Sequence, residues 1–288
     1  MYFQIFMKTR NKGLILSFIG VLILSPDSLL IRLVDLDDFS LIFYRSALPI
    51  VTILIFLIYT YQESFLKSFY LIGIPGIVYA ILYAITHICF VYSIQNTAVA
   101  NTLVLIASAP IFAALFSVFI LKEIPSIFTW IVILISMFAM IIIGVGSFTS
   151  TGLYGDIMAL IVAIGMGFSM VLVRLFKNKD LVPACLLGCL ISALYALPFG
   201  INFDLNNNQF ILILIMCLIL LPIPFMIMTI SPKFAPAHEV ALIFLLESVL
   251  GTTWVWFIIQ EVPPLNTIIG GILLLGSVTI FIYQTTKK

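Results

Sequence analysis

Long apolar runs, separated by short polar breaks, make up nearly the whole chain. A helix needs about 20 mostly apolar residues to cross a bilayer, and ten runs reach about that length. Each run therefore predicts one transmembrane helix. The predicted spans cover residues 14–34, 39–60, 70–94, 98–121, 127–146, 153–175, 181–200, 209–230, 237–259 and 264–284.

Basic residues test this number of spans independently, because cytoplasmic loops of membrane proteins are enriched in Lys and Arg. If the spans alternate in direction, eleven of the thirteen basic residues fall on one side, and only Arg32 and Arg45 fall in the other half of the membrane. The loops of that other side have acidic residues instead. We therefore predict an all-α polytopic membrane protein with ten transmembrane helices and with both termini in the cytoplasm.

The N-terminal region resembles a signal peptide, because Lys8, Arg10 and Lys12 precede the first apolar run. That run is about 20 residues long, no small-residue cleavage site follows it, and further spans come after it. We therefore interpret it as the first retained helix. The sequence does not specify whether Met1 or Met7 is the natural start.

Composition excludes several classes of protein. Of the 288 residues, 63% are apolar and only 9% are charged, whereas soluble domains have about 25% charged residues. The formal net charge is +1 and like charges form no long block, so nucleic-acid binding has no support. No HExxH or phosphate-loop motif indicates an enzyme. Neither a cofactor nor a metal site is predicted, because the cysteines stand inside apolar runs, as Cys89, Cys185, Cys189 and Cys217.

Two halves of the chain resemble each other. The stretch Phe119–Pro125 (FILKEIP) aligns with Phe257–Pro263 (FIIQEVP) at an offset of 138 residues, and Arg174 closes its span as Arg32 does. Ten spans then divide into two repeats of five, within residues 1–148 and 149–288. Because five is odd, the second repeat must be inverted relative to the first. Inverted repeats are typical of secondary transporters, which bind their substrate near the midplane between the halves.

At these residues the chain resembles a known family. An arginine early in the second span (Phe43–Leu48, FYRSAL), a small-residue and proline pattern in the fourth (Ala107–Ile111, ASAPI) and the pair Lys122-Glu123 at its end are similar to EamA-type transporters of the drug/metabolite transporter superfamily. The resemblance covers almost the whole chain and implies transport of small molecules, such as amino acids or other metabolites. Gln260 stands where the second repeat would have the lysine, so that pair cannot be essential in both halves.

Four ionisable residues lie deep inside predicted spans, namely Asp27, Arg45, His87 and Glu247. Charges near the bilayer centre are costly, so such residues are candidates for function by default. With a rise of 1.5 Å per residue, all four fall at the membrane centre or in its non-cytoplasmic half. We expect them to meet around one cavity.

Each of these residues has a functional and a structural interpretation. Glu247 could titrate a proton or contact a cation, or it could be a permanently protonated acid that is bonded to a neighbouring helix. Asp27 follows Pro26, which is expected to break the helix, and it could contact the substrate, carry a proton or pair with Arg45 or Arg32. Arg45 could bind a substrate carboxylate with two hydrogen bonds or neutralise Asp27.

The third span has an aromatic stripe, because Tyr79, Tyr83 and His87 follow one another at intervals of four. Their side chains share one helix face, which suits the wall of a substrate cavity; ring packing is the alternative. In the ninth span, His238 and Glu239 lie near the cytoplasmic end. We expect both at the membrane interface, where water solvates them.

Small residues and prolines predict where helices pack closely or bend. Ala159, Ala163 and Gly167 recur at intervals of four, which lets a neighbouring helix approach closely. Pro49, Pro110, Pro222 and Pro224 lie inside spans, where proline kinks a helix. Such kinks suit helices that bend during alternating access.

We therefore expect a secondary transporter that exports a small polar or amphipathic metabolite, such as an amino acid or a related zwitterion, across a bacterial inner membrane. A non-transporting sensor or scaffold is one alternative, and a transporter of phosphorylated metabolites is another. The expected partners are a small-molecule substrate and the lipid bilayer. Proton coupling through Glu247 or Asp27 is a further hypothesis. The sequence specifies neither the substrate, the coupling ion nor the oligomeric state.

Overall fold

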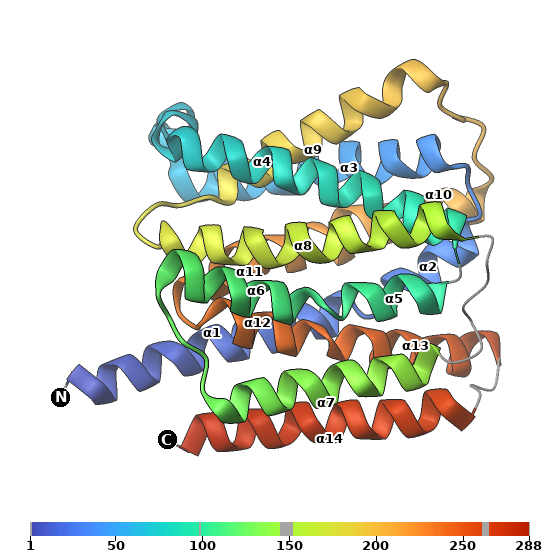
Figure 1. Cartoon of the computed structure of the whole chain (residues 1–288). Coiled ribbons are helices and arrows are strands. Elements are labelled where there is room, and N and C mark those ends of the chain that lie inside the picture. Colours follow the sequence, from blue (N-terminus) through green and yellow to red (C-terminus); the bar gives the residue numbers. More distant parts are fainter. Residues whose placement is uncertain (1, 98, 145–151, 261–264, 288) are drawn as a thin grey trace.

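The described part of the protein is built from helices. The computed structural model describes residues 2–97, 99–144, 152–260 and 265–287, and these residues form α-helices and short 3-10 and π segments without any strand. The helices run side by side, and the chain passes back and forth across the molecule (Figure 1). The predicted all-helical class is confirmed.

Each predicted span has a helical counterpart, and several spans are divided into two helices. The undivided helices are α3 (Asp38–Tyr61), α4 (Phe65–Asn96), α7 (Ile127–Gly144), α8 (Leu153–Leu175), α9 (Val182–Ala196) and α14 (Leu265–Lys287). The divided spans form the pairs α1 (Tyr2–Leu24) and α2 (Asp27–Val34), α5 (Val99–Ile106) and α6 (Ala109–Phe116), α10 (Asn207–Ile215) and α11 (Pro222–Ile230), and α12 (Ala237–Phe244) and α13 (Leu246–Ile259).

Proline stands at three of these divisions, including Pro222 as the first residue of α11, and it has no N–H for the helical hydrogen bond. Pro26 separates α1 from α2, and Pro110 stands in the first turn of α6. Both breaks agree with the sequence-based expectation. Pro49 differs, because α3 continues through it. The division between α10 and α11 coincides with a π-helical segment, Met216–Leu220.

The helices have the length and apolarity of a membrane protein. Eight stretches of the described residues qualify as candidate spans, and one of them, Asp38–Asn96, contains both α3 and α4 within its 59 residues. Within α7, Ile127–Ile143 is a shorter apolar helix. Large apolar side chains such as Ile55 and Leu134 are exposed on the outer surface, where lipid would cover them.

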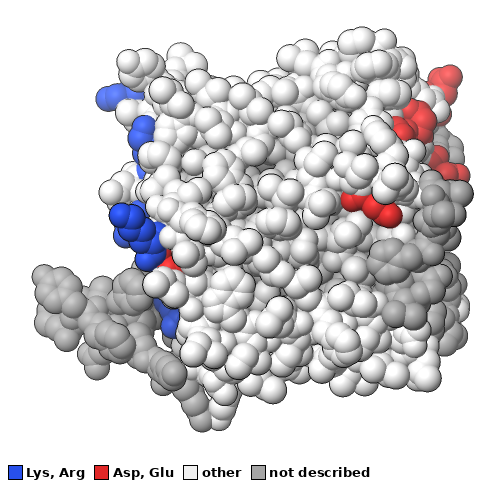
Figure 2. All heavy atoms as spheres, viewed as in Figure 1, with Lys and Arg blue, Asp and Glu red and all other residues white. Residues whose placement is uncertain are grey.

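The two ends of the molecule differ in charge. Both termini lie at the same end, on the left in Figure 1. On the face drawn in Figure 2, Lys and Arg side chains gather along that end, most Asp and Glu side chains lie at the opposite end, and uncharged side chains fill the band between them. The predicted boundary between the halves, at residues 148 and 149, lies outside the described residues.

Close packing of α8 agrees with its ridge of small residues. Ala159 and Ala163 are fully buried. At Gly167, an added Cβ would lie 2.8 Å from the backbone N of Ala113 and 3.0 Å from the carbonyl O of Ala109. The absence of a side chain at Gly167 therefore allows α6 to lie directly on α8.

Candidate functional site

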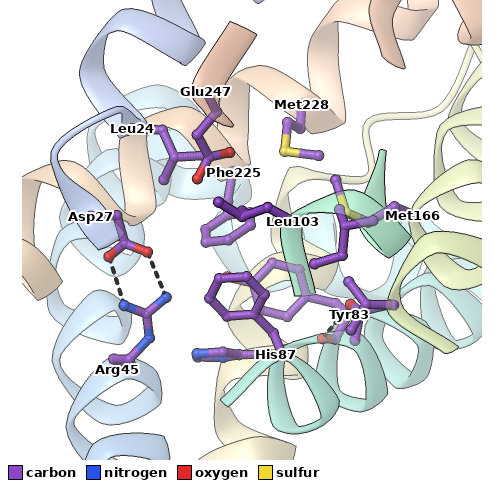
Figure 3. A pocket seen from close by; sticks show the side chains of 14 residues that line it. Leu24, Asp27, Arg45, Tyr83, His87, Leu103, Met166, Phe225, Met228 and Glu247 are labelled. Atoms are coloured by element: carbon purple, nitrogen blue, oxygen red, sulfur yellow. Dashed lines mark hydrogen bonds and ion pairs between the residues drawn. The ribbon is translucent and has the colours of Figure 1, made fainter. Parts of the chain in front are cut away.

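A central cavity of about 90 Å³ brings together five of the six residues that the sequence singled out (Figure 3). These residues come from helices α2, α3, α4 and α13. The cavity is otherwise lined mostly by apolar side chains. The predicted residues in its wall are Asp27, Arg45, Tyr83, His87 and Glu247, and the others are Leu24, Thr86, Phe90, Leu103, Ile106, Val162, Met166, Phe225 and Met228.

Three helix interruptions converge on this cavity. Asp27 follows the break between α1 and α2, Ile106 is the last residue of α5, and Glu247 is the second residue of α13. Interrupted helices expose backbone groups that transporters use at their substrate sites. The local sequence that breaks each helix thus also positions a residue of the cavity wall.

Asp27 and Arg45 form a buried ion pair. Arg45 Nη1 and Nη2 donate hydrogen bonds of 2.6 and 2.9 Å to the two carboxylate oxygens of Asp27, and the two residues are 1% and 2% exposed. The guanidinium also lies 5.6 Å from the ring centre of Phe90. The sequence left open whether Asp27 pairs with Arg45 or with Arg32. In this structure Asp27 pairs with Arg45, and the side chain of Arg32 lies outside the described residues.

The carboxyl group of Glu247 lines the same cavity as the ion pair (Figure 3). It is repelled by Asp27 and attracted by Arg45. Within the described part of the chain, this carboxyl has neither a hydrogen bond nor an ion pair. Among the described residues, the interpretation as a protonated acid bonded to a neighbouring helix therefore has no partner.

Helix α4 contributes the aromatic stripe, whose members line two cavities. His87 lines the central cavity, Tyr79 lines a smaller one of about 40 Å³, and Tyr83 lines both. The Tyr79 hydroxyl is 2.8 Å from Thr229 Oγ1, which draws it away from the central cavity. His87 Nδ1 is 3.3 Å from Ser46 Oγ, and its Nε2 has no partner among the described residues.

Most of the remaining cavity wall could not be identified from the sequence, because apolar residues inside apolar spans give no signal. Thr86 and Phe90 are exceptions, since they follow Tyr83 by three and seven positions and so share its helix face. Phe225 and Met228 belong to the walls of both cavities. They separate the central cavity from the smaller one.

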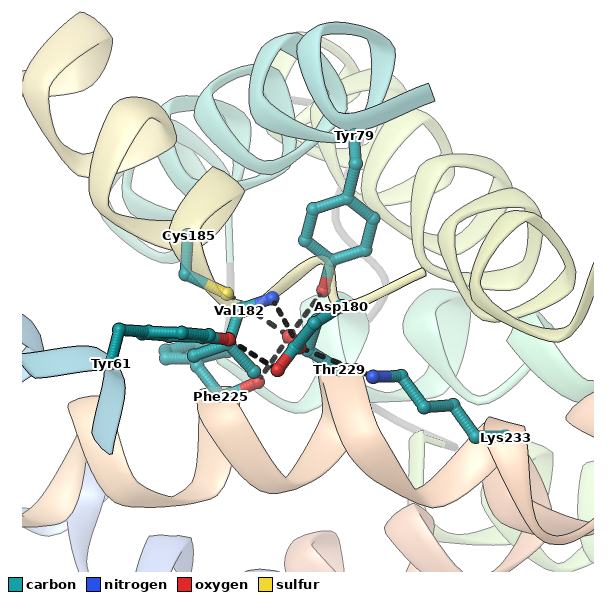
Figure 4. Close-up of polar contacts among 8 residues, drawn as sticks. All are labelled: Tyr61, Tyr79, Asp180, Val182, Cys185, Phe225, Thr229 and Lys233. Carbon is teal, nitrogen blue, oxygen red and sulfur yellow. Dashed lines mark hydrogen bonds and ion pairs between the residues drawn. The ribbon is translucent and has the colours of Figure 1, made fainter. Parts of the chain in front are cut away.

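At the basic end of the molecule, Asp180 ties three elements together (Figure 4). It accepts hydrogen bonds from the Tyr61 hydroxyl at the end of α3, from the backbone N–H of Val182 in α9 and from Lys233 Nζ, the last at 3.1 Å. Burial alone would raise the pKa of Asp180, but the hydrogen bond from Tyr61 and the charge of Lys233 outweigh it and lower that pKa. The network joins residues that are far apart in the sequence.

The structure corrects the expected environment of His238 and Glu239. They are 4% and 3% exposed, because α12 packs against α1, α6 and α8 at this end. Arg10 compensates the charge of Glu239 with two hydrogen bonds, one of them 2.9 Å from Nε to Oε2. The expectation that water solvates the two residues is wrong.

Comparisons with known proteins agree with this architecture. The EamA-like transporter family matches the chain twice, over residues 11–145 and 153–283. The pseudopaline exporter CntI of Pseudomonas aeruginosa is 25% identical over 259 residues, which cover 86% of this chain and 87% of the exporter. The exporter of the same name from a second strain is 26% identical over 260 residues, with the same coverage.

A solved crystal structure shares the fold, with a TM-score of 0.79 at 15% identity over 96% of this chain and 99% of that one. The family match and the apolar helices confirm the predicted membrane transporter and its predicted localisation, an integral protein of the bacterial inner membrane. Because the two family matches together span almost all residues, the chain belongs to the EamA-like transporter family.

Proposed function

We propose that the protein exports a small polar or amphipathic metabolite, an amino acid or a related zwitterion, by alternating access of two inverted halves, residues 1–148 and 149–288. The observation that carries the proposal is the central cavity. It brings Asp27, Arg45 and His87 of the first half together with Glu247 of the second. A site between two halves becomes accessible from alternate sides when the halves move against each other.

Backbone geometry supports the two-repeat arrangement. Lys122 and Gln260, which are 138 positions apart, are both left-handed, with φ of 58° and 61°. The same offset relates the break at Ala107 to the break at Leu245. Corresponding positions in the two halves therefore end or interrupt their helices in the same way.

Ten crossings with cytoplasmic termini are part of the proposal. Helices α3 and α4 are separate passes within one apolar stretch, and α7 supplies another pass despite its shorter apolar length. Both termini lie at the end where Lys and Arg side chains gather (Figure 2). Because basic residues favour the cytoplasmic side, that end is the cytoplasmic one.

The chemistry of the cavity favours a zwitterion. A substrate carboxylate would compete with Asp27 for the planar guanidinium of Arg45, which binds carboxylates with two parallel hydrogen bonds. A substrate ammonium group would face Glu247, and the rings of Tyr83 and Phe90 offer an apolar wall. A phosphorylated substrate is disfavoured, because Arg45 is the single Arg or Lys among the described lining residues.

The names of the relatives indicate which compounds to test. Two exporters of pseudopaline align over most of this chain, so pseudopaline is one probe and the twenty amino acids are others. Purified protein in proteoliposomes should exchange at least one labelled probe across the membrane. A folded protein that binds a probe without moving it would instead support a sensor.

Variants of the cavity residues test the site. We expect Arg45→Ala and Glu247→Gln to reduce exchange about tenfold or more, the equivalent of about 1.4 kcal/mol, whereas Lys177→Ala on an exposed connection should exchange as the wild type does. Wild-type exchange by Arg45→Ala would contradict the proposed site.

Proton coupling is tested separately. If transport is coupled to protons, a pH gradient should accelerate exchange by the wild-type protein. An unchanged pH dependence of exchange in both Glu247→Gln and Asp27→Asn would exclude coupling through these residues.

A further inference from the structure

A second polar cavity, of about 350 Å³, lies at the basic end of the molecule. Its wall includes the ionisable side chains of Arg10, Glu123, Arg174, His238 and Glu239, together with the hydroxyl residues Ser126 and Thr129. It has no lining residue in common with the central cavity. The mechanism proposed above makes no use of these side chains.

The residues of this cavity come from both halves of the chain, and its charges are balanced. Arg10 in the first half is bound to Glu239 in the second. Glu123 in the first half is bound to Arg174 in the second, with Arg174 Nε and Nη2 each 3.1 Å from Glu123 Oε1. Two ion pairs therefore connect the halves at this end, and any opening here must break or exchange them.

Two hydrogen-bonding atoms at the cavity remain without a partner among the described residues. They are Nδ1 of His238, a residue that is 96% buried, and Oε2 of Glu123. Buried polar atoms are normally hydrogen-bonded, so both positions can take an external donor: Glu123 Oε2 as a carboxylate oxygen, and His238 Nδ1 in the tautomer that has its proton on Nε2. An ammonium group supplies three N–H donors, whereas no cluster of three metal-ligating side chains exists in the described ranges.

The cationic side of the cavity suits a carboxylate. Arg174 Nη1 donates to the carbonyl oxygen of Lys233 at 3.2 Å, which holds the guanidinium in place, and its other nitrogens face Glu123. Because a guanidinium binds carboxylates with two hydrogen bonds, a ligand carboxylate can take the place of the Glu123 carboxylate. Glu123 is then released to accept hydrogen bonds from the ligand's ammonium group.

We propose that this cytoplasmic cavity is a second binding site for a zwitterionic metabolite, with the ammonium group on Glu123 and His238 and the carboxylate on Arg174. The inference rests on the proposed function, because an exporter must capture its substrate on the cytoplasmic side. Binding exchanges the Glu123–Arg174 bridge between the halves for bridges to the ligand. Capture of the ligand thus loosens the cytoplasmic end.

Helix α12 connects the two sites along the chain. Val240, Leu242 and Ile243 are fully buried between His238 at the start of α12 and Glu247 in α13. The two sites have no lining residue in common, which makes them experimentally separable.

A cysteine reporter at Ser126, an exposed residue of the cavity wall, tests the proposal. The full-length Ser126→Cys protein in detergent is labelled with a maleimide in the presence of each amino acid or pseudopaline. We expect at least one zwitterion to slow labelling about threefold or more at saturation. Its analogues without the amine or without the carboxylate should not do so.

Three variants complete the experiment. Glu123→Gln and His238→Gln, checked for folding by their melting temperatures, should lose the protection, and Lys177→Cys, outside the cavity, should show none. Protection must persist when Arg45→Ala disables the central site; its loss there, or no protection by any probe, would overturn the proposal. If a probe is exchanged in proteoliposomes but does not slow the labelling of Ser126→Cys, the cytoplasmic site is refuted and the transport function is not. If a probe slows labelling but is not exchanged, the transport function is refuted and the cytoplasmic site is not.

Discussion

Asp27 and Arg45 illustrate how single charged residues persist inside a membrane protein. Each is almost completely buried, and each alone would carry a large desolvation cost. Their two hydrogen bonds offset part of that cost. The pair remains exchangeable, because a ligand carboxylate offers Arg45 the same bonds. The proposed function thus uses a charge, that of Arg45, whose partner a ligand can replace.

A double-mutant cycle measures the coupling of this pair. Asp27→Asn and Arg45→Met should each lower the free energy of unfolding by about 3–5 kcal/mol, because each leaves one buried charge without its partner. The double variant should lose much less than the sum. The measurement is a reversible SDS titration in mixed micelles with Lys177→Ala as control. Strictly additive losses would show that the two side chains are not coupled.

At the scale of elements, the helices combine interruptions with close contacts. The breaks between α1 and α2, α5 and α6, and α12 and α13 lie beside the central cavity. By contrast, α6 and α8 touch so closely at Gly167 that a Cβ would overlap with backbone atoms. Interrupted helices supply the site, and tightly packed helices hold it in place.

A pair of glycine substitutions tests this close contact. Gly167→Ala should lower the melting temperature in detergent, because overpacking costs about 1–3 kcal/mol and the opposing atoms belong to the backbone of α6. Gly276→Ala in α14 is the matched control, since nothing lies within 4 Å of its added Cβ and alanine is the better helix former. Equal melting temperatures of the two variants would argue against tight α6–α8 packing.

At the scale of the whole molecule, the charges are sorted between the two ends (Figure 2). The basic end has the ion pairs Arg10–Glu239, Arg174–Glu123 and Lys233–Asp180. At the other end, hydrogen bonds join the halves, such as that from the Tyr44 hydroxyl to the Asn202 carbonyl. Ion pairs therefore close the end that we propose to face the cytoplasm.

Labelling of single cysteines determines which end faces the cytoplasm. In intact spheroplasts, an impermeant maleimide should label Asp204→Cys and should label Lys177→Cys only after permeabilisation; both positions are exposed. The wild-type chain is the control, because three of its four cysteines are buried. The reverse pattern would invert the proposed orientation, and equal access would refute the number of crossings between the two sites.

Properties of single residues were enough to predict the helices of this protein, its deep charges and some of its helix breaks. The free energy of transfer into lipid depends on each residue's own side chain, so apolar runs predicted the helices and the few deep charges stood out. Proline acts on its own helix, so the breaks at Pro26 and Pro110 were predictable. Pro49 was not, because α3 accommodates it without ending.

Which side chains meet depends on how the helices pack. Asp27 pairs with Arg45, the Tyr79 hydroxyl contacts Thr229, and Glu239 is buried against Arg10, 229 positions away in the chain. These partners lie on different helices, and no periodicity within one helix encodes how another packs against it. The sequence alone was therefore enough to predict the apolar helices and some of their breaks, whereas the contacts between side chains of different helices required the folded structure.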